Sequence, residues 1–323
     1  MFAVKAAVRF GACDAEKSMQ DRLTADVGRA YAGNTGGGSG NYVRADSLKS
    51  AIAALSTGPK TILAGGTDVF PRLQDRPLTG AVLDISGIPE LGTIAFDGSY
   101  WRIGAAASWS KLLKADLPAA FDGLKAAARE VGSVQIQNRA TIVGNLCNAS
   151  PAADGVPPLL TLDAEVEIVS ANGMRHLPLS AFIRGNRKTA LGAGEMVSAL
   201  RISAASAAGR SGFLKLGARS YLVISISMAA LRLVVDDAGI IEDVSLAIGA
   251  CSEVAQRMDG VEAVLRGAAL VRAAGKITPD LFTSLSPIDD VRATAAYRLE
   301  ASCEIARRLV RDQLAYGANE AVA

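Results

Sequence analysis

The chain has 323 residues, half of them apolar and many of those alanine, and its 34 basic and 32 acidic residues give a net charge of +2. This length exceeds what one small core needs, so two or three subdomains are expected. The near balance of charge predicts no strong field for nucleic acid or an anionic membrane, and the lack of an apolar run of roughly 18 residues or of a secretory start predicts a cytoplasmic protein with no membrane span.

Residues 1–40 precede the first regular pattern and mix charged with small residues. They end in GNTGGGSG, a Gly/Ser run that is typical of a flexible linker. We therefore expect an N-terminal extension over 1–40, followed by one unit over 41–207 and a second over 208–323.

The segment after this extension carries the pattern of a small parallel unit. Ser47 is a helix cap in front of an amphipathic stretch, which predicts a short helix over 47–56. Buried strands are expected over 61–63 and 81–85, with a helix over 69–74 between them. Strand, helix and strand in this order predict a parallel βαβ unit.

The next segment combines regular elements with a long loop. A strand is expected over 100–105, a helix capped by Ser108, and a second helix over 121–131. Residues 132–158 are rich in Gly, Asn, Ser and Pro and are predicted to be irregular. Loops of this length are usually functional.

The remainder predicts antiparallel strands and a final helix. A hairpin turn is expected at Asn172-Gly173, and a long helix over 289–313 carries Val291 and Leu309 on its apolar face. The expected strands are 164–170, 174–177, 197–202, 212–216, 224–235 and 240–248.

Side chains for acid–base or metal chemistry are scarce. The four cysteines are widely spaced with no CxxC, which argues against an iron–sulfur or zinc site in this chain. We interpret Cys147 as a small residue in a loop and the single histidine, His176, as a surface or turn residue. A large chain with few catalytic groups indicates that a cofactor carries the reaction.

The first glycine-rich loop is Ile62-Leu63-Ala64-Gly65-Gly66-Thr67-Asp68-Val69, between a strand and a helix. Two glycines allow close approach to a ligand, and successive amides suit pyrophosphate oxygens. Thr67 adds a hydroxyl, and Asp68 either caps the helix or binds a sugar hydroxyl. The pattern is neither GxGxxG nor a P-loop, so a plain strand-to-helix turn fits as well as a phosphate cradle.

The second glycine-rich loop runs from Thr141 to Asp154, with the sequence TIVGNLCNASPAAD. Asn145, Asn148, Ser150 and Asp154 are short polar groups in apolar surroundings, and buried polar groups need partners. A polyhydroxylated cofactor chain would supply those partners. Hydrogen bonds within the loop would supply them equally well.

Together the two loops resemble those of the FAD-binding medium subunit of the xanthine dehydrogenase and carbon monoxide dehydrogenase family. The resemblance runs from about Tyr42 to the C-terminus and rests on ordered matches. These are Tyr42-Val43-Arg44, the segment FIRGNRKTAL (182–191), Gly194-Glu195-Met196-Val197, Phe213-Leu214-Lys215, and Arg219.

The resemblance implies an α+β fold. Two subdomains would bind FAD, as in the fold of vanillyl-alcohol oxidase, and a C-terminal α+β domain with an antiparallel sheet and helices would follow. On this basis 41–207 is the FAD-binding domain and 208–323 the C-terminal flavoprotein domain.

The resemblance also assigns roles to residues. Ile62 to Val69 would wrap the FAD pyrophosphate, and Thr141, Ile142, Val143, Gly144 and Asn145 would form a second cradle. Asp154 would accept a hydrogen bond from an FAD hydroxyl. Val131 and Val197 would contact the cofactor, and Lys215 would lie near the flavin, where a cation favours the reduced anion. A surface lysine on a strand is the alternative for Lys215.

Three departures from the family pattern stand out. Val143 replaces the first of two glycines that commonly precede Asn145. Ala45 stands where a Tyr-x-Arg-Pro opening has proline. The cysteines do not match the cluster-bearing insertion of hydroxybenzoyl-CoA reductases.

The function implied is electron transfer within a heteromeric molybdenum hydroxylase. A large molybdopterin subunit would hydroxylate the substrate, and two [2Fe–2S] clusters on a small subunit would pass electrons to FAD on this chain. NAD, oxygen or another acceptor would receive them, in a dimer of heterotrimers. No residue here would be catalytic. A stand-alone FAD-dependent oxidoreductase of the same fold is the alternative, and a scaffold that has lost FAD is another. The sequence specifies neither the hydroxylated substrate nor the acceptor.

Overall fold

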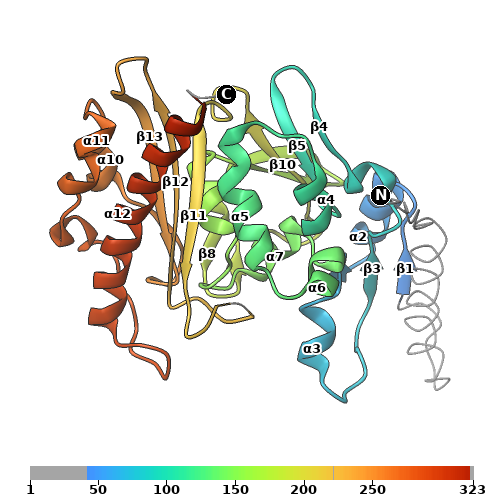
Figure 1. Ribbon diagram of the computed structural model, residues 1–323. Helices are drawn as coiled ribbons and strands as arrows, with labels where there is room; N and C mark the ends of the chain where they lie inside the picture. Colours follow the sequence, from blue (N-terminus) through green and yellow to red (C-terminus); the bar gives the residue numbers. More distant parts are fainter. Residues whose placement is uncertain (1–41, 221, 321–323) are drawn as a thin grey trace, which may run out of the picture.

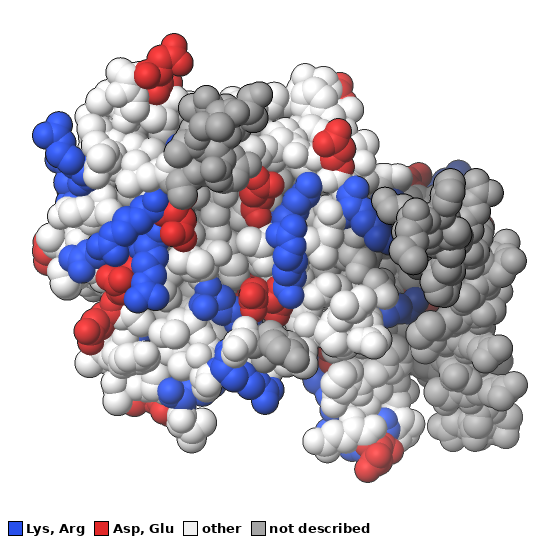
Figure 2. Space-filling view, viewed as in Figure 1, with Lys and Arg blue, Asp and Glu red and all other residues white. Residues whose placement is uncertain are grey.

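The computed structural model describes residues 42–220 and 222–320, with side chains to residue 314. The expected N-terminal extension and Cys13 lie outside the described residues. No helix in the described part is long and apolar enough to cross a membrane. On the face seen in Figure 2, basic and acidic side chains lie interleaved among uncharged ones.

A three-stranded parallel sheet begins the fold. Its order is β1 (Tyr42–Arg44), β3 (Val82–Asp84), β2 (Thr61–Leu63), and both pairings are parallel. The predicted cap is confirmed: the Ser47 hydroxyl accepts from Ser50 N, at the start of α2 (Leu48–Ser56). Helix α3 (Val69–Leu73) follows β2, so the predicted βαβ unit is also confirmed.

A five-stranded antiparallel sheet forms the middle of the molecule, in the order β4-β5-β10-β6-β7. The predicted hairpin joins β6 to β7, where Gly173 has φ +113°, a conformation that suits glycine. His176 lies on β7 with its side chain 36% exposed. The strands are β4 (Ile94–Phe96), β5 (Tyr100–Gly104), β6 (Glu165–Ser170), β7 (Gly173–Pro178) and β10 (Met196–Ser203).

The prediction of an irregular stretch over 132–158 is wrong. Three short helices occupy it: α6 (Val134–Arg139), α7 (Ile142–Asn148) and α8 (Val156–Thr161). Each has six or seven residues, too few for a 3.6-residue apolar period to repeat convincingly. Local capping signals were present, because Ser133 and Thr141 cap α6 and α7 with their hydroxyls.

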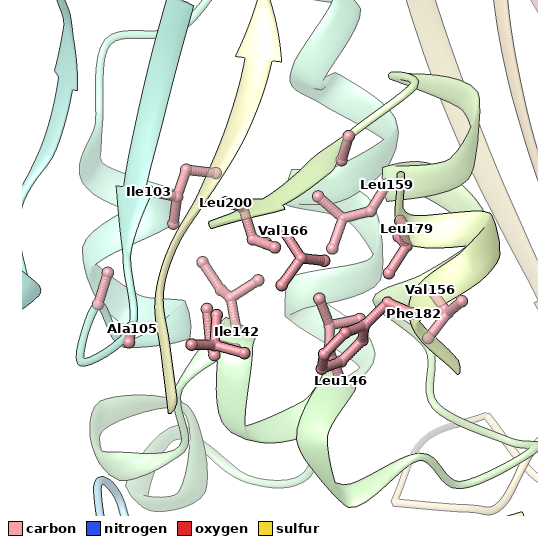
Figure 3. Packing of buried hydrophobic residues seen from close by; sticks show 14 of the residues in the cluster. Ile103, Ala105, Ile142, Leu146, Val156, Leu159, Val166, Leu179, Phe182 and Leu200 are labelled. Carbon is pink, nitrogen blue, oxygen red and sulfur yellow. The ribbon is translucent and has the colours of Figure 1, made fainter. Parts of the chain in front are cut away.

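Helix α7 joins the second glycine-rich loop to the core. Figure 3 shows Ile142 and Leu146 of α7 directed at apolar side chains of the five-stranded sheet and at Phe182. All of these side chains are buried in one cluster. The loop is therefore anchored by packing along one side of a helix.

The C-terminal sheet is antiparallel throughout, in the order β11 (Arg210–Leu216), β12 (Ser227–Val235), β13 (Ile241–Gly249), β14 (Gln256–Arg257). Helix α12 (Ala295–Glu320) packs on β11 and β12, while α5 (Asp122–Glu130) packs on β11 and α8 on β12 and β13 (Figure 1). Alternate residues of a strand face opposite sides. Leu231 accordingly joins the cluster with α12, and Ala230 joins a cluster with Ala127 of α5. Burial on both sides explains the nearly continuous apolar run of β12.

Two of the predicted C-terminal elements start later than expected. Strand β12 begins at Ser227 and not at Ile224, and α12 begins at Ala295 and not at Asp289. Asp289 and Thr294 instead accept hydrogen bonds from the first turn of the helix, at Ala295 N and Tyr297 N. Val291 is fully exposed, so it is not part of the apolar face.

The remaining helices lie beside the two larger sheets. Helices α4 and α5 lie beside the central sheet, and α10 and α11 lie near α12 (Figure 1). Their bounds are α4 (Trp109–Lys114), α5 (Asp122–Glu130), α9 (Leu179–Phe182), α10 (Asp259–Leu265), α11 (Leu270–Ala273) and α12 (Ala295–Glu320), with β8 (Ile183–Gly185), β9 (Lys188–Thr189), β11 (Arg210–Leu216), β12 (Ser227–Val235), β13 (Ile241–Gly249) and β14 (Gln256–Arg257).

Two arginines of the C-terminal sheet hold the end of α8. Arg232 Nε donates to Thr161 O over 2.8 Å, and Arg257 Nη1 donates to Leu160 O over 3.1 Å. Cations at a helix C-terminus satisfy its free carbonyls and its dipole. Because α8 follows the second glycine-rich loop, these contacts fix that loop against the C-terminal sheet.

Candidate cofactor-binding site

A cavity of about 570 Å³ lies between the two glycine-rich loops. This volume is within the range of small-molecule and cofactor sites. Its walls come from the first loop and the start of α3, from Val131 through α7, and from the segment between β9 and β10. Single residues from β3 to α4 close it: Ile85, Ala105 and Trp109.

The first glycine-rich loop requires its two glycines. A methyl at Gly65 would lie 2.0 Å from Arg139 O, which is backbone and cannot move aside easily. Gly66 has φ +75°, and a methyl there would lie 2.6 Å from the Phe70 ring. The close contact at Gly65 brings the first loop against the segment that leads into the second.

The amides of the first loop are free. Within the described residues, no backbone N–H from Ala64 to Asp68 donates to a protein acceptor. Buried or half-buried amides are normally paired, and a run of unpaired amides in a loop makes an anion-binding concavity. The first loop therefore fits a pyrophosphate better than a plain strand-to-helix turn.

Asp68 links the two loops. It precedes α3, but its side chain makes no capping hydrogen bond, so the helix-cap alternative is wrong. Instead Asp68 Oδ1 accepts from Asn148 Nδ2 over 2.8 Å, across 80 residues of chain. The contact fixes the distance between the two walls of the cavity.

The amides of the second loop are mostly used within the protein. Gly144 N donates to Thr141 Oγ1 over 3.0 Å, and Asn145 N donates to Thr141 O over 3.1 Å. Ile142 N donates to Ala107 O over 3.2 Å. Val143 packs into the apolar core while part of it lines the cavity. This segment therefore contributes mainly side chains to the cavity, and it does not present a row of unpaired amides.

Most polar side chains of the second loop have partners within the protein. Ser150 Oγ accepts from Ala152 N, and Asn148 pairs with Asp68. Asp154 pairs with other side chains, as described below. Asn145 differs, because its Oδ1 is buried without a hydrogen-bond partner in the described structure.

Asp154 and Lys215 form a buried ion pair. Lys215 Nζ lies 2.6 Å from Asp154 Oδ2, with the two side chains 6% and 9% exposed. Ser225 Oγ donates to Asp154 Oδ1 over 2.7 Å. Burial raises the pKa of Asp154 above its usual value, although the charge and hydrogen bond of Lys215 and the hydrogen bond of Ser225 oppose the rise. Lys215 is therefore neither a surface lysine nor a free cation.

Two arginines contact Asn148 on the cavity wall, and one of them, Arg72, lines the cavity itself. Arg72 and Arg187 both donate to Asn148 Oδ1. Arg187 has φ +60°, and its backbone N donates to Ala149 O over 2.8 Å. Both arginines are exposed, so they add positive charge near the anion-binding loop.

The structure brings most of the predicted site residues to one cavity. Those on its wall are Ile62, Ala64, Gly65, Gly66, Thr67, Asp68, Val69, Val131, Thr141, Val143, Gly144, Asn145 and Val197. Four predicted residues do not line it. Leu63 and Ile142 are buried in the core, and Asp154 and Lys215 are occupied by their ion pair.

Several residues on the wall were not predicted. They are Lys60, Arg72, Ile85, Ala105, Trp109, Ile136, Ala140, Cys147, Asn148, Leu191 and Glu195. Asn148 and Cys147 belong to the second loop and could have been included on that ground. The other unpredicted wall residues lie far apart in the sequence and meet at the cavity only in the folded chain.

The donor set of the cavity fits FAD. Free amides between Ala64 and Asp68 suit a pyrophosphate, and Val131, Val143 and Val197 offer apolar contacts. The buried polar atoms Trp109 Nε1 and Asn145 Oδ1 have no partner in the described structure. A ligand with phosphates, hydroxyls and an aromatic ring system would meet all three features.

Two protein families match the chain. The FAD binding domain in molybdopterin dehydrogenase matches residues 36–204, and the CO dehydrogenase flavoprotein C-terminal domain matches residues 213–313. The nicotinate dehydrogenase FAD-subunit of Eubacterium barkeri is 32% identical, over 81% of this chain and 92% of that protein. The xanthine dehydrogenase FAD-binding subunit of Escherichia coli O157:H7 is 30% identical, over 85% and 96%.

A solved structure agrees with the fold. Reconstituted CO dehydrogenase from Oligotropha carboxidovorans contains a chain with a TM-score of 0.77 and 26% identity. The likeness covers 85% of this chain and 97% of that one. The predicted α+β fold, with its C-terminal antiparallel sheet, is thereby confirmed.

Proposed function

The chain belongs to the family of FAD-binding subunits of molybdopterin dehydrogenases, and on this premise we propose that it receives electrons from [2Fe–2S] clusters of a partner subunit and delivers them to an external acceptor. The chain is an oxidoreductase subunit with an FAD-binding domain. Bound FAD supplies the redox chemistry. The protein contributes binding, orientation and electrostatics.

The observation that carries this proposal is the free row of amides beside the cavity. The amides from Ala64 to Asp68 would hold the pyrophosphate, with Ile62 and Val69 at the two ends of the same loop. Positive charge at Arg72 would favour the same anion. Tight contact at Gly65 holds the loop in the conformation that leaves these amides free.

The second loop would hold the cofactor chiefly through its wall and side chains. Thr141, Val143, Gly144 and Asn145 line the cavity, and Val131 and Val197 add apolar surface. Because three amides of this segment are already paired, its share of phosphate binding would be smaller than that of the first loop.

Asp154 and Lys215 do not line the cavity, so any effect they have on the flavin would be indirect. Their ion pair leaves little net charge, so Lys215 would affect the flavin less than a free cation would. A direct hydrogen bond from FAD to Asp154 would require the pair to rearrange. Asp154→Ala tests this role, because unchanged FAD occupancy would remove Asp154 from the site.

The proposed partners are a large molybdopterin subunit and a small subunit with two [2Fe–2S] clusters, in a dimer of heterotrimers. Relatives named as FAD-subunits or medium chains of dehydrogenases support a complex of several subunits. The proposed domains are 41–207 for FAD binding and 208–323 for the C-terminal flavoprotein domain, and the ends of the two family matches support that division. NAD, oxygen or another compound would be the acceptor.

Purification from the native host tests the proposal. Flavin absorbance should co-elute with molybdenum and iron, and added substrate should bleach the flavin until an acceptor is supplied. A colourless, metal-free, solitary chain with no affinity for added FAD would contradict it. Turnover by the isolated chain would point to a stand-alone flavin enzyme instead.

A further inference from the structure

Two buried polar atoms at the cavity lack partners. Trp109 Nε1 and Asn145 Oδ1 make no hydrogen bond within the described residues, although both residues line the cavity. Trp109 is 0% exposed. An unpaired buried donor or acceptor costs about 1–3 kcal/mol, so native structures rarely leave one without a ligand or water.

The fold holds these two side chains next to the second glycine-rich loop. Trp109 N donates to Ala140 O over 3.1 Å, and Ser108 bridges to Thr141. A methyl at Gly155 would lie 2.6 Å from the Trp109 ring and 3.0 Å from Asn145 Oδ1. The Trp109 ring and Asn145 Oδ1 therefore both pack closely against Gly155, where a residue with a side chain would not fit.

The two atoms have opposite requirements. An indole N–H can only donate, and an amide oxygen can only accept. A phosphate at neutral pH offers acceptors alone, so it could satisfy Trp109 but not Asn145. A hydroxyl group both accepts and donates, so one hydroxyl could satisfy both atoms.

We propose that Trp109 and Asn145 bind a hydroxyl group of the cofactor's sugar chain. The indole N–H of Trp109 donates to the hydroxyl oxygen, and Asn145 Oδ1 accepts a hydrogen bond from the hydroxyl group. Asn145 is half-buried and lies on the cavity wall. The other polar groups of this loop already have protein partners, which singles out Asn145 for the ligand.

This inference rests on the proposed binding of FAD in the cavity. FAD carries hydroxyls in two places, on the ribityl chain and on the ribose of its adenosine half. The full-length chain, stripped of flavin, would be titrated separately with FAD, with FMN and with ADP. FMN has only the ribityl chain and ADP only the ribose, so the three titrations distinguish the two sources.

Trp109→Phe is the main variant, because it keeps an aromatic ring and removes the N–H. Trp101→Phe is the matched control, since Trp101 packs on Phe96 and Phe121 and is not on the cavity wall. We expect Trp109→Phe to weaken FAD binding about fivefold and Trp101→Phe to leave it unchanged. Equal affinities in the two variants would overturn the inference.

An NMR signal gives a readout that is independent of stability. The chain has two tryptophans, so its spectrum contains two indole N–H signals, and each Phe variant assigns one. Binding of FAD should shift the Trp109 signal downfield, and the same shift should appear with FMN or with ADP. A Trp109 signal that does not move on saturation with FAD would mean that water or protein, and not the cofactor, pairs with it.

Asn145 variants test the kind of ligand group. Asp at this position keeps an acceptor for a hydroxyl but repels phosphate, so Asn145→Asp should bind FAD within about threefold of the wild-type chain. Asn145→Leu removes the acceptor and should weaken binding about fivefold. A loss in Asn145→Asp that exceeds the loss in Asn145→Leu would indicate a phosphate and overturn the hydroxyl assignment. Failure of the wild-type chain to bind FAD would instead count against the proposed function.

Discussion

The two glycine-rich loops look alike in sequence but differ in how they use their backbone. The amides from Ala64 to Asp68 have no acceptor among the described residues, whereas those of Ile142, Gly144 and Asn145 donate within the protein. The first loop turns from a strand into a helix and stays open. The second is a capped helix in which three of these amides already have acceptors within the protein.

This difference shows that a glycine in a motif does not by itself mean a phosphate cradle. At Gly65 the glycine is needed because Arg139 O leaves no room for a methyl group. At Gly144 the nearest atom to an added methyl is the Thr141 hydroxyl, at 2.7 Å, which belongs to a side chain. The backbone of the first loop would therefore bind the cofactor, while the second presents side chains and a packed wall.

The largest effect should come from Lys215→Met, which tests whether the end of the second loop depends on contacts within the protein. Removal of Lys215 leaves Asp154 buried without its cation, and such a loss typically costs about 3–5 kcal/mol of unfolding free energy. Chemical denaturation of the wild-type chain and the variant measures the loss. A loss of FAD affinity with unchanged stability would contradict the internal role of this pair.

The loss of stability in Lys215→Met should depend on pH. The folded-state pKa of Asp154 lies above its unfolded value and should rise further without Lys215. A carboxyl of this kind binds more protons when folded, so stability falls as pH increases from near 4 through the raised pKa. Lys215→Met should therefore be nearly as stable as wild type in acid and fall behind it as pH rises. A constant difference across pH would refute the explanation.

Gly65→Ala should have the next largest effect on stability and FAD binding. It tests whether the backbone of the first loop holds the cofactor. The added methyl clashes with Arg139 O, so the first loop must move, at about 1–3 kcal/mol of stability. We expect FAD affinity to fall about a hundredfold, as displaced amides no longer face the ligand. Gly92→Ala is the control, because nothing lies within 4 Å of an added methyl there. Titration with FAD compares the two.

Gly144→Ala should have a smaller effect on FAD binding. Its methyl disturbs the Thr141 cap of α7, and loss of such a cap costs about 1 kcal/mol. FAD affinity should fall less than about tenfold, since the amide of Gly144 is already paired. If titration gave the same loss of affinity for Gly144→Ala and Gly65→Ala, the two loops would be equivalent phosphate cradles.

Val143→Ala should have the smallest effect on FAD affinity. Val143 packs into the apolar core, so its truncation should lower the melting temperature. Its replacement of a family glycine should matter little for phosphate binding if the first loop provides most of the cradle. We expect FAD affinity within about twofold of wild type. A clear gain in affinity would mean that Val143 restricts the approach of the cofactor.

Local sequence patterns predicted much of the fold because they depend on near neighbours. The caps at Ser47 and Ser108 act on amides three residues away, and the hairpin at Gly173 depends on one backbone conformation. The helices within 132–158 were not predicted from the sequence because each is too short for its apolar period to repeat. The start of α12 was misplaced because apolar residues in front of Thr294 continued its pattern by chance.

Short motifs in a fixed order were enough to find the two glycine-rich loops and to recognise the family, and the family resemblance in turn implied the α+β fold. What each loop does depends on contacts that form only when the chain is folded. The Asp154–Lys215 pair joins residues 61 positions apart and the Asp68–Asn148 bond joins residues 80 apart. Trp109 reaches the cavity through contacts with the second loop. Such partners, distant in the sequence, decide whether an amide is unpaired and whether a charge has a counter-ion. No local sequence pattern specifies them.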